Sequence, residues 1–179
     1  MIDIERRKKL AFHLRQLSVG LTTNDDFENN IADDVSYGWL PEQYYRSKQV
    51  KHDDAVIVPM LELCWGLYND TKSHKLKGKY ALNQEAEIVI ARSILFLHSD
   101  KEYECPYIQT VVISSIRDLL SGILTLGYTW SARNRKLQKA FEEHKKLGDY
   151  NVWPFFRNSD YREQLQKQPF LNNTKKAAQ

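Results

Sequence analysis

NQEAEIVIARSILFLH, residues 83–98, is the stretch that decides the fold class of this chain. Apolar residues recur along it at the spacing of an α-helix, and further apolar residues widen the stripe to more than one side. Asn83 can cap the start of this helix, because its side-chain oxygen can accept a hydrogen bond from a backbone amide of the first turn. We therefore predict a buried, central helix that ends near His98.

Similar helical patterns lie on both sides of this central segment. Residues 3–19 and 24–36 each carry an apolar stripe, and Gly20 between them is a natural helix stop. The chain has only seven glycines and five prolines, so helix breakers are few. The predicted fold is all-α, an irregular helical bundle of five to seven helices with an N-terminal helical hairpin. Further helices are predicted at 53–68, 106–126 and 130–147, which makes six, and the sequence leaves open one short helix at 41–49 and another near 159–167.

The predicted organisation has three parts. They are a helical hairpin over 1–36, a helical bundle core over 37–148, and an aromatic-rich C-terminal strap with a frayed tail over 149–179. We expect the three parts to form one compact domain, since 179 residues are enough for one hydrophobic core. Five aromatic residues lie within 150–161, and we expect Trp153 among them to be largely buried against the bundle.

Charge is distributed unevenly along the chain. The net charge of +3 is too small to indicate a nucleic-acid-binding protein by itself. Residues 21–70, however, carry three basic and ten acidic groups, whereas 71–179 carry eighteen basic and eleven acidic groups. Such asymmetry is typical of a docking surface for a charged partner, or of two parts of one fold that face each other.

The second helix of the hairpin concentrates the acidic groups. A helix-turn-helix interpretation would place it among DNA phosphates, which would repel it, so we exclude sequence-specific DNA binding. Its apolar seam is narrow, so the acidic side should remain exposed and attract a basic protein, or a basic helix of a second copy in self-association. The residues predicted to bind are Asp25, Asp26, Asp33 and Asp34.

Arg92 and His98 suggest a different function. An Arg followed after five residues by a His resembles the motif of HEPN-type helical ribonucleases. That resemblance implies metal-independent RNA cleavage, with His98 as general acid/base and Arg92 stabilising the phosphate transition state. Residues six apart, however, lie about 120° apart around a helix axis. The competing interpretation is an ion pair inside the bundle, between Arg92 and either Glu62 or Asp118.

Other chemical signatures are missing from the sequence. It has no glycine-rich phosphate loop, no HExxH, no nucleophile elbow and no Glu-x-x-His pair, and no Cys/His cluster accompanies Cys64 or Cys105. We therefore predict no metal and no cofactor. Two free thiols fit the reducing cytoplasm, and no secretory signal is evident. Arg117 and Asp118 at the centre of 107–128 argue against a membrane span.

These observations leave three functional hypotheses. The first is a non-catalytic protein-interaction module, which makes the protein more a binding protein than an enzyme. The alternative is the HEPN-like ribonuclease that uses Arg92 and His98. A second alternative is a sensor that binds a small ligand, for which the sequence indicates no ligand.

Overall fold

The secondary structure is helical. The computed structural model describes residues 1–39, 52–105 and 148–167, together with positions 43–44, 47–48, 50, 135, 138–139, 142 and 145–146. Within these residues every named element is a helix, and the only extended pairing is an isolated bridge between Thr23 and Lys75. The prediction of an all-α fold is confirmed.

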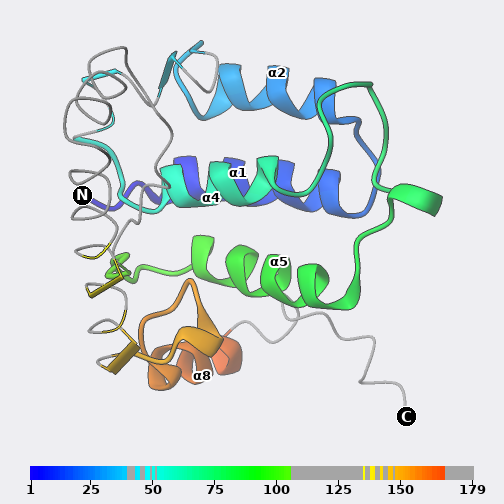
Figure 1. Ribbon diagram of the computed structural model, residues 1–179. Helices are drawn as coiled ribbons and strands as arrows, with labels where there is room; N and C mark the ends of the chain where they lie inside the picture. Colours follow the sequence, from blue (N-terminus) through cyan, green and yellow to red (C-terminus); the bar gives the residue numbers. More distant parts are fainter. Residues whose placement is uncertain are drawn as a thin grey trace.

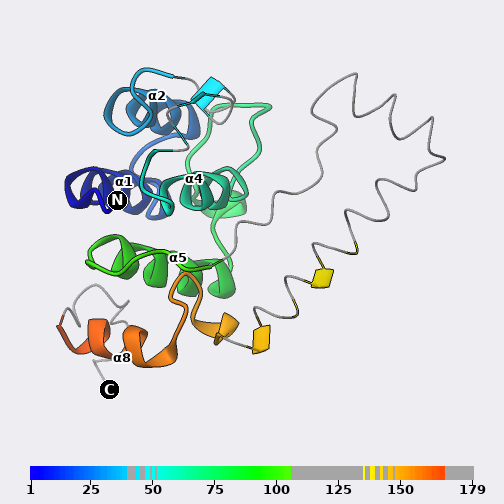
Figure 2. The ribbon, with the colours of Figure 1, turned by 90° about the vertical axis from the view of Figure 1, so that its left-hand side faces the viewer.

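The helices are arranged in layers (Figure 1). Helix α2 lies on one side of α1, α5 lies on the other side, and α8 lies beyond α5. Figure 2 shows α4 beside α1 in the same layer. The α-helices are α1 (Ile4–Ser18), α2 (Asn24–Asp34), α4 (Ile57–Trp65), α5 (Gln84–Leu97) and α8 (Asn158–Lys167), and two 3₁₀ turns occupy Gly78–Tyr80 and Tyr150–Val152.

Helix α1 is the central element, since it packs against α2, α4 and α5. Its apolar stripe is fully covered by these neighbours: Leu10, Leu14 and Leu17 have no exposed surface. Burying a leucine side chain contributes about 1.5–3 kcal/mol. Gly20 adopts a φ of +65° after the helix, a conformation that glycine adopts without steric cost, and this turns the chain toward α2.

Helices α2 and α5 each begin at a side-chain cap, and the cap at Asn83 is the one predicted from the sequence. The side chain of Thr23 accepts a hydrogen bond from the amide of Asp26, and that of Asn83 accepts one from the amide of Ala86. Helix α4 is shorter than the predicted 53–68, because it begins at Ile57. Pro59 therefore lies in the first turn, where its missing amide hydrogen leaves no helix hydrogen bond unmade.

Several predicted segments lie outside the described residues. They are the helix over 106–126 and most of those over 41–49 and 130–147. Within the part of the chain that the structure describes, no helix is long and apolar enough to cross a membrane.

The C-terminal strap packs on the core as predicted, and Phe155 is the most deeply buried of its described aromatic side chains. Phe155 is 1% exposed, and its ring lies edge-on to that of Phe96 in α5, with 5.0 Å between centroids. Trp153 is only half-buried at the edge of the core. Its indole N–H donates a hydrogen bond to the hydroxyl of Tyr103. The indole needs this polar partner, so the purely apolar Phe155 occupies the interior position instead.

Candidate functional site

Two neighbouring arginines at the start of α1, Arg6 and Arg7, carry buried charges. Arg7 has no exposed surface, and its guanidinium donates to both carboxylate oxygens of Asp54, at 2.6 and 2.8 Å. Its remaining amino group donates to the carbonyls of Ser99 and Lys101, at 3.1 and 2.8 Å. Every side of this guanidinium is therefore used to join α1 to the loops before α4 and after α5.

Arg6 makes a parallel set of contacts. It forms an ion pair with Asp53 at 2.9 Å and donates to the hydroxyls of Tyr44 and Tyr37 and to the carbonyl of Val35. Tyr44 is itself fully buried and donates to Asp53. Because these groups satisfy one another, they form a structural network rather than a reactive site.

The network makes stability depend on acid pH. Burial alone would raise the pKa values of Asp53 and Asp54, but the hydrogen bonds from Arg6 and Arg7 outweigh burial, and both pKa values lie below the ordinary one. The unfolded state then binds more protons, so we expect stability to fall as the pH drops below about 4. Urea unfolding at a series of pH values checks this, and Asp54→Asn should flatten that part of the curve. An unchanged slope in that variant would contradict the assignment.

The acidic face predicted on α2 is present, with one exception. Asp25, Asp26 and Asp33 are exposed, and no basic group of the described residues pairs with them. Asp34, in contrast, accepts from His13 at 2.7 Å and lies 3.5 Å from the ammonium of Lys9. The hydrogen bond from His13 lowers the pKa of Asp34. Asp34 thus joins α2 to α1, and we define the acidic face as Asp25, Asp26 and Asp33.

An exposed aromatic turn follows α2, which the sequence interpretation did not identify. Trp39 is 45% exposed, and the turn that presents it contains two residues of positive φ, Tyr37 and Gly38. The hydroxyl of Ser36 donates to the carbonyl of Trp39 at 2.6 Å, and the guanidinium of Arg6 lies 4.4 Å from the centre of the Tyr37 ring. Strained turns that are held this firmly are common at binding sites. In the sequence, the Tyr-Gly-Trp stretch at the end of the predicted helix was the signal that could have indicated this turn.

Arg92 and His98 occupy different parts of α5. Arg92 lies in the body of the helix, half-buried, and its buried Nε atom has no hydrogen-bond partner among the described residues. His98 is the C-cap of the helix, and burial lowers its pKa, helped by the positive charges of Lys8 and Arg15. Among the described residues no hydrogen bond or ion pair joins Arg92 to His98 or to Glu62. Asp118 lies outside those residues.

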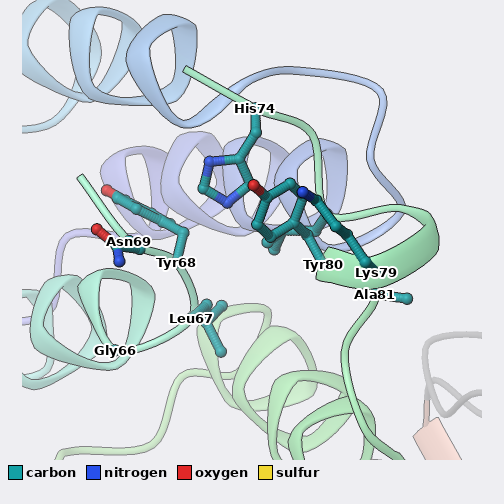
Figure 3. Close-up of a pocket in the computed structure, with 9 residues that line it drawn as sticks. Gly66, Leu67, Tyr68, Asn69, His74, Lys79, Tyr80 and Ala81 are labelled. Atoms are coloured by element: carbon teal, nitrogen blue, oxygen red, sulfur yellow. The ribbon is translucent and has the colours of Figure 1, made fainter. Parts of the chain in front are cut away.

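A small cleft lies between the end of α4 and the loop that precedes α5. Its volume is about 270 Å³, and His74, Tyr68 and Tyr80 project around it (Figure 3). Neither Arg92 nor His98 lines it. The sequence interpretation treated this lysine-rich loop as an ordinary surface loop and did not predict a cleft there.

The described residues include no side-chain arrangement typical of a metal site. No group of three or more His, Cys, Asp or Glu side chains among the described residues is arranged to hold a metal ion. Burial raises the pKa of the Cys64 thiol, and it raises that of Cys105 to about 11. Both thiols are therefore protonated at neutral pH and are poor nucleophiles or ligands.

Comparison with known proteins gives no further information about these sites: no protein-family model, no curated protein and no solved structure matches this chain.

Proposed function

We propose that this protein is a non-catalytic interaction module that binds a basic protein surface through the acidic face of α2. The observation that supports this is the division of α2 into two sides. Phe27 and Ile31 are buried against the rest of the molecule, whereas Asp25, Asp26 and Asp33 stay exposed. We propose further that the whole chain forms an irregular bundle of five to seven helices, from which its N-terminal hairpin presents this face.

The aromatic turn after α2 adds a second element of recognition. Exposed tryptophan is enriched among the residues that dominate binding energy in protein interfaces. Trp39 stands on a turn fixed by Ser36 and by the Arg6–Tyr37 stacking, so little entropy would be lost on binding. An exposed tryptophan ring and exposed carboxylates each suit arginine side chains, which stack on aromatic faces and pair with acids. The proposed partner is therefore a protein with an arginine-rich surface, or a basic helix of a second copy.

The ribonuclease alternative has less support in the geometry. It requires Arg92 and His98 to act on one phosphate, yet no described contact joins them, and they lie in the middle and at the end of α5. The free, buried cysteines are consistent with the proposed reducing, cytoplasmic location.

Charge reversal tests the proposed surface. The variant Asp25→Lys/Asp26→Lys/Asp33→Lys should weaken binding to an arginine-rich peptide by about tenfold or more, because three attractive contacts become repulsive. The salt dependence of binding should also flatten. Fluorescence anisotropy of a labelled peptide, measured at low and at physiological salt, gives both quantities. Sedimentation of the unlabelled wild-type and variant chains tests whether the same charge reversal weakens self-association.

Helix α5 offers a matched control. Glu85 and Glu87 are exposed acids in its first turn, so Glu85→Lys/Glu87→Lys makes two charge reversals, against three in the test variant, with a similar cost to the helix dipole. This control should bind the peptide with little change beyond the effect of net charge. If the two reversed proteins bind equally, the acidic face of α2 is not the binding surface.

A further inference from the structure

The loop beside the cleft is firmly held although most of its side chains are exposed. Asn24, which is 1% exposed, accepts a hydrogen bond from the amide of His74 at 2.7 Å and donates to the carbonyl of Lys72 at 3.3 Å. The amide of Asn24 also donates to the carbonyl of His74. Leu76 is 4% exposed and anchors the loop in the core. The loop therefore presents its side chains from a defined backbone.

Positive charge is concentrated on this loop. Lys72, Lys75, Lys77 and Lys79 are all exposed, and none of them pairs with a carboxylate among the described residues. Asp70 is the only acidic residue between positions 66 and 81. Gly78, with a φ of +59°, reverses the chain so that Lys79 and Tyr80 lie over the cleft. A closely spaced set of unpaired lysines attracts a polyanion.

The cleft itself offers aromatic surfaces. The rings of His74 and Tyr80 lie 4.2 Å apart between centroids, and the ammonium of Lys79 lies 4.8 Å from the centre of the Tyr80 ring. Tyr68 lines the other side, with its hydroxyl donating to Glu28. Figure 3 shows the imidazole of His74 between the two tyrosines. Such rings are the surfaces on which nucleobases stack.

His74 can also select the base by a hydrogen bond. Its Nδ1 lies 2.8 Å from the carbonyl of Lys72, and a carbonyl only accepts, so Nδ1 carries the proton in the neutral ring. The other ring nitrogen, Nε2, is then an acceptor on a ring that lines the cleft. The exocyclic amine of an adenine or cytosine supplies the matching donor.

We propose that this cleft binds a nucleotide, with the base against Tyr80 and His74 and the phosphate on Lys79. The volume of about 270 Å³ suits one base, and leaves the sugar and phosphate at the opening beside the lysines. The same chemistry is offered by a free nucleoside monophosphate and by one nucleotide of single-stranded RNA. This site is separate from the acidic face of α2 and does not depend on the function proposed for that face.

The proposal is tested by titrating the full chain with AMP, adenosine, inorganic phosphate and a short oligoadenylate. Binding is measured by amide chemical shifts and by calorimetry. AMP should bind more tightly than adenosine or phosphate, with shifts centred on residues 66–81. Tyr80→Ala should weaken AMP binding about tenfold through lost stacking. Lys79→Ala should weaken AMP binding and reduce the slope of the logarithm of affinity against the logarithm of salt concentration by about one. Lys146 is also exposed, and Lys146→Ala should change neither the affinity nor this slope.

The two sources of the nucleotide give different results. Oligoadenylate that binds at least tenfold more tightly than AMP, with Lys75→Ala and Lys77→Ala each weakening it, identifies single-stranded RNA as the ligand. If AMP and oligoadenylate bind with equal affinity, the ligand is the free nucleotide. The proposal is overturned if no nucleotide shifts residues 66–81, or if phosphate binds as well as AMP and Tyr80→Ala has no effect. In the latter case the lysines are a general anion-attracting surface.

Discussion

Replacing Arg7 with alanine should lower the free energy of unfolding by about 3–5 kcal/mol. The change removes two hydrogen bonds to Asp54 and leaves that carboxylate, which is itself 4% exposed, with only the amides of Asp3 and Val56. It also leaves the carbonyls of Ser99 and Lys101 without their donor. A buried charge that has lost its partner costs more than the pair contributed, so the loss should exceed that from removing an exposed ion pair.

Chemical denaturation of the purified variants measures this loss. The exposed, bidentate pair of Arg157 and Glu104 gives a matched control, because Arg157→Ala removes the same side chain with both hydrogen bonds. That variant should lose far less stability than Arg7→Ala, because both partners of the pair are exposed to solvent. Arg7→Ala combined with Asp54→Ala should recover part of the loss, since no lone buried charge remains. If Arg7→Ala and Arg157→Ala lower the free energy of unfolding by the same small amount, the buried Arg7 network stabilises the fold no more than an exposed ion pair does.

The helices could be predicted where the information was local. Apolar spacing identified α2 and α5, and the cap at Asn83 marked the start of α5, because these signals lie within one or two turns of the element they define. The Arg6–Asp53 and Arg7–Asp54 pairs could not be predicted in this way. Arg6 and Arg7 look like ordinary surface charges in sequence, and their partners lie forty-seven residues away.

The candidate sites differ in the same way: features set by local sequence could be predicted, and features set by long-range packing could not. The exposure of Asp25, Asp26 and Asp33 follows from the narrow apolar seam of α2, so it could be expected from the sequence. The pairing of Asp34 with His13 depends on how α2 packs against α1, which periodicity does not specify. The cleft depends on Asn24, a buried side chain at the start of α2 that holds a loop fifty residues later. No local pattern marks a contact of that kind.

The second large effect is expected at the strap. Phe155→Ala should lower the free energy of unfolding by about 3–5 kcal/mol, because it removes a fully buried ring and leaves a cavity. The ring contacts Phe96 of α5 and lies 5.5 Å from that of Tyr161 in α8, so it joins the two helices. Trp153→Ala, at the half-buried neighbour, should cost less, within about 0.5–3 kcal/mol.

Urea unfolding and amide hydrogen exchange together distinguish how the strap is attached. If residues 148–167 belong to the same cooperative unit as α1 and α5, Phe155→Ala lowers global stability and speeds exchange in α5 as well as in α8. Phe155→Leu should retain most of the stability, because it keeps the apolar contact with Phe96 and most of the buried volume. A Phe155→Ala protein with unchanged global unfolding and faster exchange only in 148–167 would contradict this. The strap would then be a separately detaching segment, and the prediction of one compact domain would fail with it.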